Sequence, residues 1–121
     1  MKQVFFVPER GDVVLVSLPS FSGKGRDART GPRSTGRRAA VVLSPQSYNQ
    51  RTGLALVCPI TSRITGYPFE VLLPPGLPVA GAMLADQAMC LDWRAHRAEK
   101  ISSLPSGAVE EALGKLLALL T

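Results

Sequence analysis

The apolar residues of this chain come in short runs that glycine and proline interrupt, and this pattern limits the folds that the chain can adopt. The runs are of strand length and rich in Val, Leu and Ile, which is typical of buried β-strands rather than helices. We therefore predict five strands, over residues 12–18, 39–43, 54–60, 69–73 and 83–91. Five strands in a chain of 121 residues indicate a mainly β fold built on a compact, strongly bent sheet or barrel.

Helical periodicity is present only near the C-terminus. Between residues 105 and 120 apolar side chains recur at three- and four-residue spacing, which predicts one amphipathic helix. A short helical turn is expected after Ser44 and Pro45, because Ser is a favoured N-cap and Pro a favoured first helical residue. The chain should then turn at Gly53 into the third strand, and residues 74–78 should form a loop.

We expect residues 1–121 to form one domain, because a chain of this length can bury a core of its own. Residues 19–36 differ from the rest in being rich in Ser, Gly and Arg, with Phe21 as the one large apolar residue. Loops longer than ~12–15 residues in a compact domain are usually functional or disordered. The sequence therefore predicts a long, basic, flexible loop over residues 19–36.

Basic residues are concentrated in one part of the chain. Eight Lys and Arg residues lie between Lys24 and Arg63, against Asp27 as the single acid. Such a field attracts polyanions, whether nucleic acid, an acidic protein tail or an anionic membrane. No apolar stretch approaches the ~20 residues that span a bilayer, and the N-terminus has too few apolar residues for a secretory signal. We therefore expect a soluble cytoplasmic protein with no membrane partner.

The titratable residues disfavour several kinds of active site. Asp27 is the only acid between residues 12 and 70, so a nuclease with two metal ions lacks carboxylate ligands. His96 is the only imidazole, which rules out a pair of histidines within one chain. Cys58 and Cys90 lie in apolar runs and are expected to be buried, although one disulfide between them stays open. We expect no metal and no cofactor.

RNA cleavage is one reaction that Arg and Thr can support without a metal. The 2′-hydroxyl beside the scissile phosphate is a built-in nucleophile, so the protein need supply only geometry, charge stabilisation and proton handling. The planar guanidinium of Arg matches phosphate oxygens and stays protonated at physiological pH. A Thr hydroxyl can form a hydrogen bond with a phosphate oxygen or with the 2′-hydroxyl.

Several short motifs follow one another along the chain. They are Gly11-Asp12-Val13-Val14-Leu15-Val16, Gly36-Arg37-Arg38-Ala39-Ala40-Val41-Val42-Leu43-Ser44-Pro45, Pro59-Ile60-Thr61, Gly66-Tyr67-Pro68-Phe69-Glu70-Val71, Ala85-Asp86-Gln87 and Asp92-Trp93-Arg94. In this order and spacing they resemble the motifs of the MazF/PemK (ChpB-like) toxins, which are endoribonucleases of type II toxin–antitoxin systems. The resemblance runs from about Val7 to the C-terminal helix.

The resemblance implies an SH3-like, five-stranded antiparallel barrel with a C-terminal helix, assembled as a homodimer. It implies sequence-specific, metal-independent cleavage of single-stranded RNA, including mRNA, to 2′,3′-cyclic phosphate and 5′-hydroxyl ends, which inhibits translation and growth. It also implies an antitoxin partner whose acidic, disordered C-terminal tail occupies the basic groove, and contact with operator DNA only through that antitoxin.

By position, the resemblance implies that Arg38 and Thr61 are the catalytic residues and that Gln87 contacts RNA. The full set of candidate RNA-binding residues is Lys24, Arg26, Arg29, Arg33, Gly36, Arg37, Arg63, Gln87 and Arg94. Two positions depart from the family pattern, since Arg33 stands where relatives carry an acid and Ala39 where they carry Pro. The rings of Trp93 and Tyr67 could stack on a base or pack at the rim of the barrel.

Two other functions are compatible with the sequence. A non-catalytic nucleic-acid-binding barrel would account for the basic loop. A gyrase-targeting toxin of the CcdB type would share the barrel, but those toxins act through a C-terminal Trp-Gly-Ile, whereas this chain ends in Leu-Leu-Ala-Leu-Leu-Thr.

Overall fold

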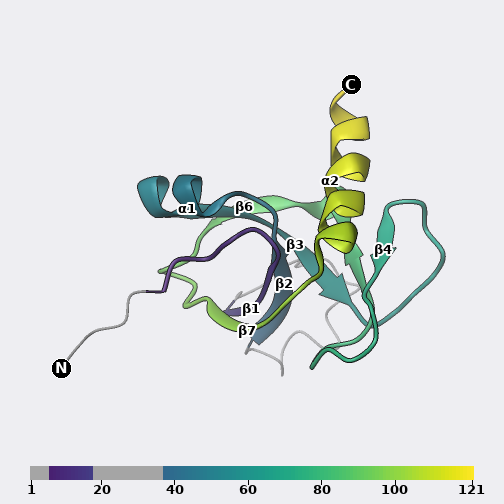
Figure 1. The fold of residues 1–121 in the computed structure, drawn as a ribbon, viewed down its shortest axis with the longest axis horizontal. Helices are drawn as coiled ribbons and strands as arrows, with labels where there is room; N and C mark the ends of the chain where they lie inside the picture. Colours follow the sequence, from purple (N-terminus) through teal and green to yellow (C-terminus); the bar gives the residue numbers. More distant parts are fainter. Residues whose placement is uncertain (1–5, 18–36) are drawn as a thin grey trace.

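The computed structural model describes residues 6–17 and 37–121, which form seven strands, two α-helices and one 3-10 turn (Figure 1). In chain order the elements are β1 (Asp12–Ser17), β2 (Arg37–Val42), α1 (Gln46–Thr52), β3 (Leu54–Thr61), β4 (Glu70–Leu72), β5 (Ala82–Leu84), η2 (Ala85–Gln87), β6 (Met89–Asp92), β7 (Glu99–Ser103) and α2 (Ser106–Leu120). The predicted loop over residues 19–36 lies outside the described residues.

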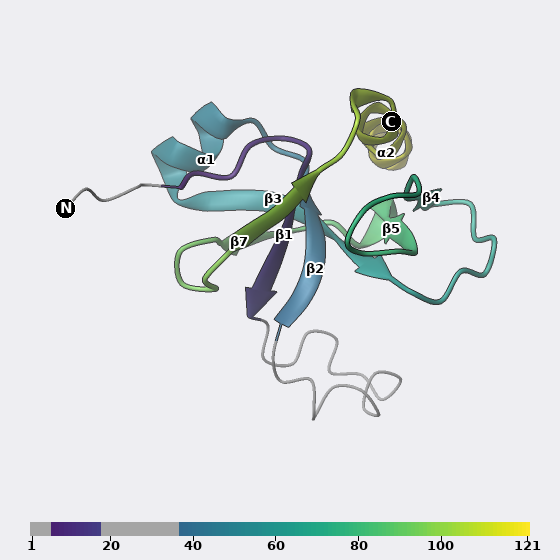
Figure 2. The same cartoon turned by 60° about the horizontal axis from the view of Figure 1, so that its bottom comes forward.

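The strands form one antiparallel sheet in the order β4-β5-β3-β2-β1-β7, with β6 paired to β3 beyond this path. The sheet is strongly bent, and in the view of Figure 2 the strands β7 and β1 cross in front of β3. The two helices lie apart, α1 beside the start of β3 and α2 beside η2 and β4 (Figures 1 and 2). The mainly β, barrel-like fold with a C-terminal helix is therefore confirmed.

The number of strands differs from the prediction, so the expected count of five was wrong. The apolar run 83–91 is two strands, since the 3-10 turn η2 separates β5 from β6. The additional strand β7 was missed because most of its side chains are polar, and in the described residues it pairs only with β1. A strand at the edge of a sheet can be polar, because little of it is buried.

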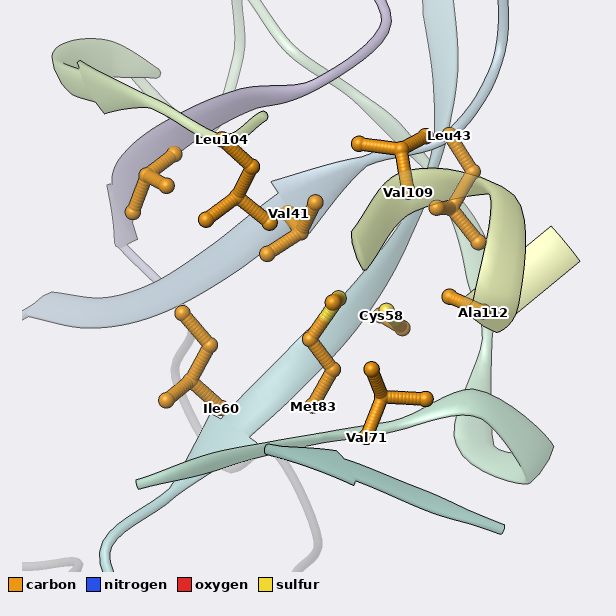
Figure 3. Close-up of a cluster of buried hydrophobic side chains, with 10 residues drawn as sticks. Val41, Leu43, Cys58, Ile60, Val71, Met83, Leu104, Val109 and Ala112 are labelled. Carbon is orange, nitrogen blue, oxygen red and sulfur yellow. The ribbon is translucent and has the colours of Figure 1, made fainter. Parts of the chain in front are cut away.

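Two apolar clusters lie on the two faces of the central strands. One contains Val41 and Cys58 and is covered by α2 through Val109 and Ala112 (Figure 3). The other consists of Val14, Val16, Ala40, Val42, Ala55, Val57, Leu91 and Trp93. Along each central strand, successive residues belong in turn to one cluster and then to the other, because successive side chains point to opposite faces. Each fully buried Val or Leu contributes ~1.5–3 kcal/mol to the free energy of unfolding.

The turn after Ser44 is a helix, but Ser44 is not its cap. No side chain caps the start of α1, whose N-cap is Pro45. The hydroxyl of Ser44 instead donates 2.6 Å to Oδ1 of the buried Asn49 and accepts a hydrogen bond from the amide of Leu56. The helix ends at Thr52, and the chain turns at Gly53 into β3, as predicted; Gly53 has the left-handed conformation. Ser44 therefore joins α1 to β3.

Only one of the two cysteines is buried. Cys58 is fully buried, and burial raises the pKa of its thiol to about 12. The prediction was wrong for Cys90, which is exposed because it alternates with the buried Leu91 along β6. Both are free cysteines.

None of the helices in residues 6–17 and 37–121 is long and apolar enough to cross a membrane.

Candidate active site

The register between β2 and β3 brings Arg38 and Thr61 to the same place in the sheet. The two strands pair antiparallel as far as Ala40↔Pro59. Arg38 lies two residues before Ala40 and Thr61 two residues after Pro59. Continuing the register therefore places Arg38 opposite Thr61, and the two-residue period of a strand directs both side chains to the face of Ala40 and Pro59.

Each of these two residues pairs with a third strand, on the side away from the other residue. Arg38 pairs with Val16 of β1, and Thr61 pairs with Ala82 of β5. Within the described ranges, the pairing of β2 with β3 does not continue to Arg38 and Thr61. Both side chains are half-buried. A guanidinium and a hydroxyl thus stand at the point where two neighbouring strands part, which suits the binding of a phosphate between them.

The hydroxyl of Thr61 is already oriented by its own turn. Its Oγ1 accepts a hydrogen bond of 3.1 Å from the amide of Arg63. Because a hydroxyl has one proton and two lone pairs, the proton of Thr61 is left to be donated elsewhere. In addition, a Cβ at Gly81 would overlap the carbonyl group of Thr61 and would lie 3.1 Å from the Cα of Ser62. Gly81 therefore sets how closely the chain packs behind Thr61.

The loop of residues 62–69 that carries Arg63 is anchored at several points. The carboxylate of Glu70 accepts hydrogen bonds from the amide and hydroxyl of Thr65, at 3.1 Å and 3.0 Å, and from the amide of Gly66 at 2.9 Å. Desolvation raises the pKa of Glu70, but the hydrogen bonds together outweigh it, and the pKa is lowered. Lys115 of α2 donates 2.7 Å to the carbonyl of Pro68. The exposed Arg63 thus projects from an ordered loop.

Gln87 lies exposed in η2, between two strands that both pair with β3. The neighbouring Asp86 was not identified from the sequence. Its Oδ2 accepts a hydrogen bond of 2.6 Å from the hydroxyl of Tyr67, which raises the pKa of that tyrosine. Its Oδ1 is buried and has no hydrogen-bond partner among the described residues. No local pattern could have revealed this pair, which is 19 residues apart in the chain.

The two candidate stacking rings differ in exposure. Trp93 is 5% exposed, and its Nε1 donates 2.9 Å to the carbonyl of Asn49. The ring therefore packs in the core. Tyr67 is 45% exposed, with its ring centroid 5.9 Å from that of Phe69. Only Tyr67, of these two, has a ring accessible to a base.

Arg94 lies at the opposite end of β3 from Thr61. Its guanidinium stacks 4.9 Å from the ring centre of Trp93, whose amide donates to the carbonyl of Gly53 just before β3. The eight residues of β3 span ~25 Å at ~3.3 Å per residue. The structure therefore does not bring Arg94 to the site of Arg38 and Thr61.

Arg37 makes contacts within the protein. Its Nη2 donates to the carbonyls of Leu15 at 3.3 Å and Arg97 at 3.1 Å, and lies 3.2 Å from Oε1 of Glu99. Arg37 is therefore bound to β1 and β7, although the sequence indicated an RNA contact.

Five of the candidate RNA-binding residues lie outside the described residues, namely Lys24, Arg26, Arg29, Arg33 and Gly36. Within the described ranges, no group of three or more His, Cys, Asp or Glu residues is arranged to hold a metal ion.

Comparisons with known proteins agree on one family. The chain is 42% identical over 95 residues to the endoribonuclease toxin MazF of Escherichia coli K12, covering 78% of each chain. It is 36% identical over 116 residues to the endoribonuclease toxin ChpB of the same strain, covering 92% of each. A crystal structure of MazE–MazF (Form-II) from Deinococcus radiodurans superposes with a TM-score of 0.79 and 45% identity, covering 96% of this chain and 97% of that one.

The family model for the PemK-like, MazF-like toxins matches residues 9–120, which is nearly the whole chain. The chain therefore belongs to the PemK-like, MazF-like toxins of type II toxin–antitoxin systems.

Proposed function

We propose that this toxin is an endoribonuclease that cleaves single-stranded RNA, mRNA included, with Arg38 and Thr61 as its catalytic residues. Its family and its relatives named as endoribonucleases support the activity. The observation that carries the assignment is the register of β2 and β3, which directs Arg38 and Thr61 to the same face, just beyond the last paired residues of these two strands, Ala40 and Pro59.

The reaction uses the ribose of the substrate as nucleophile. The 2′-oxygen attacks the adjacent phosphorus as its proton leaves, the bond from phosphorus to the 5′-oxygen breaks, and that oxygen takes up a proton. The products are a 2′,3′-cyclic phosphate and a 5′-hydroxyl. Arg38 stabilises the charge on the phosphorane oxygens, and Thr61 donates its hydroxyl proton to one of them. Neither role requires a metal ion.

Residues around this centre select the RNA sequence. Gln87 lies exposed in η2, between two strands that pair with β3, and Arg63 lies exposed in the loop that follows β3. Both contact the nucleotides beside the cleaved bond. Arg94 contacts phosphate farther along the strand. The basic residues Lys24, Arg26, Arg29 and Arg33, with Gly36, supply further backbone contacts. Loss of intact mRNA inhibits translation and growth.

The toxin acts in the cytoplasm and has two protein partners. One is an antitoxin whose acidic, disordered tail competes with RNA for the basic surface, and through which any contact with operator DNA is made. The other is a second copy of the chain. Exposed apolar side chains support this homodimer, since Ile64, Leu72 and Leu117 are each more than half exposed and Leu120 is 74% exposed.

The decisive experiment is cleavage of a mixed-sequence single-stranded RNA in EDTA, followed by sequencing of the 5′ ends. Wild-type toxin should give discrete fragments with cyclic phosphate ends. Arg38→Ala should lower the rate on the order of 10³-fold, because it removes the cation beside the phosphoryl transition state. Arg51→Ala, which removes an exposed arginine from α1, is the matched control and should cleave normally.

Two results would contradict the proposal. If Arg38→Ala cleaves like the wild type, the catalytic assignment is wrong. If the wild type binds RNA with a salt slope of about −0.7 per neutralised phosphate but does not cut it, the protein is a non-catalytic binding barrel.

A further inference from the structure

The side chain of Arg37 connects three segments of the sheet. It starts on β2, passes the carbonyl of Leu15 on β1 and reaches Glu99 at the start of β7. It also binds the carbonyl of Arg97 in the turn before β7. These contacts join residues that are 22 to 62 positions apart in the chain, so they exist only in the folded sheet.

The residue that Arg37 holds in the turn has an unusual backbone. Arg97 has a φ of 53°, and it is the only non-glycine residue with positive φ in the described part of the chain. A residue in this region costs on the order of 1 kcal/mol and persists where neighbouring contacts determine it. The hydrogen bond from Arg37 to its carbonyl is one such contact.

The position of Arg37 next to Arg38 gives these contacts a consequence for the active site. Successive residues of a strand point to opposite faces, so Arg37 and Arg38 project from opposite sides of β2. At this end β2 pairs with β1 through Ser17↔Arg37 and Val16↔Arg38, whereas its pairing with β3 ends at Ala40↔Pro59. The start of β2 is therefore held by backbone pairing on one edge, and the side chain of Arg37 adds a second attachment.

We propose that Arg37 is a positioning residue, which through Glu99 and Arg97 fixes the start of β2 and thereby the approach of Arg38 to the scissile phosphate. This inference rests on the proposed function of Arg38. It replaces the expectation that Arg37 itself binds RNA phosphate. The side chain of Arg37 is one-third exposed and its guanidinium already has a carboxylate and two carbonyls as partners. A phosphate contact would have to displace them.

Steady-state cleavage and RNA binding by three variants separate the two roles. In Arg37→Gln we expect kcat to fall about tenfold, because a small displacement of a catalytic group costs much of its effect, while KM changes less than twofold. Glu99→Gln should lower kcat in the same direction by a smaller factor, since a carboxamide still accepts a hydrogen bond. The double variant should match Arg37→Gln alone, because the two residues act together.

The salt dependence of RNA binding provides the second readout. If Arg37 is a positioning residue, the slope of the logarithm of the RNA-binding constant against the logarithm of the salt concentration is unchanged in Arg37→Gln, although one positive charge has been removed. Arg51→Gln on α1 is the control for that loss of charge. A KM that rises together with a slope smaller by about 0.7 would show a lost phosphate contact and would overturn the proposal. Tighter RNA binding by Glu99→Gln together with a salt slope larger by about 0.7 would overturn it too, because a phosphate would then have taken the place of Glu99 at Arg37.

A third readout does not depend on cleavage. The amide of Ser17 donates 2.9 Å to the carbonyl of His96 and joins the end of β1 to the turn that Arg37 holds. We expect faster hydrogen exchange at Ser17 in Arg37→Gln. Should this occur in a protein that does not cut RNA, the proposed function fails but the attachment by Arg37 stands. Unchanged exchange together with unchanged kcat overturns the inference itself, and an equal thermal melting temperature verifies that the variants are folded.

Discussion

The hydroxyl oxygen of Thr61 accepts a hydrogen bond of 3.1 Å from the amide of Arg63, two residues later. Because a lone pair of this oxygen faces the amide of Arg63, the hydroxyl proton points away from that amide. A side chain that is oriented before the substrate binds needs no reorganisation during the reaction. The relationship therefore supports a hydrogen bond from Thr61 to a phosphate oxygen in the transition state.

Replacing Thr61 by Val should lower the single-turnover cleavage rate about 10²-fold, because Val keeps the branched shape but has no hydroxyl. Thr61→Ser is the matched control, since it keeps the hydroxyl, and it should stay within about tenfold of the wild type. Cleavage by Thr61→Val at the wild-type rate would remove Thr61 from the mechanism.

Replacing Gly81 by Ala should reduce cleavage by displacing Thr61. The new Cβ would overlap the carbonyl group of Thr61, and Gly81 has a φ of 130°, which side chains rarely adopt. Gly76→Ala is the control, because Gly76 also has a positive φ, of 93°, but has no atom within 4 Å of the added Cβ. Both variants should lose stability in urea unfolding, and only Gly81→Ala should lose activity under conditions in which it is folded. Equal activities would show that Gly81 does not position Thr61.

Replacing Asn49 by Ala should lower the free energy of unfolding by on the order of 3 kcal/mol. Asn49 is fully buried, and its side chain donates to the carbonyls of Pro8 at 2.8 Å and Ser44 at 3.1 Å. Removing it leaves buried groups without partners. Gln50→Ala, at an exposed position of the same helix, should change stability by no more than about 0.5 kcal/mol. Chemical unfolding of both variants tests this, and equal midpoints would contradict it.

The hydrogen bond from Tyr67 to Asp86 should stabilise the fold below pH 10 and lose its effect above it. The hydrogen bond raises the pKa of the Tyr67 hydroxyl, so the folded state holds this proton more tightly than the unfolded state. The stabilisation is present below the ordinary pKa of 10.0 and disappears as the pH rises through the raised pKa. Urea unfolding of the wild type and Tyr67→Phe should differ at pH 8 and converge at high pH. A difference in the free energy of unfolding that grows with pH would contradict the prediction.

Replacing Leu117 and Leu120 by Lys should convert the toxin from dimer to monomer. Both side chains are more than half exposed on α2, and a charge there opposes burial against a second copy. Tyr48→Lys on α1 is the control, because Tyr48 is also an exposed large side chain but lies on the other helix. Sedimentation velocity should show a dimer for the wild type and the control. A dimer in the double variant would place the interface elsewhere.

Much of the fold could be predicted because it depends on neighbours in the chain. The strand runs around Val14, Val41 and Val57 and the spacing of apolar residues in α2 are local patterns. The strand β7 could not be predicted in this way, because Glu99 and Lys100 have no apolar pattern and join the sheet by pairing with β1. The outward direction of Cys90 likewise depended on where η2 interrupts the run 83–91.

By itself, the sequence determined a mainly β chain with a C-terminal helix, and its motifs identified Arg38 and Thr61 as candidates. Only the tertiary structure decided that these two residues share one face, that Gly81 packs behind Thr61, and that Arg37 binds Glu99. The physical reason is the distance along the chain between the residues that make each contact. Periodicity reports on residues two to four positions apart, whereas these contacts depend on the register and bending of strands that lie far apart in the chain.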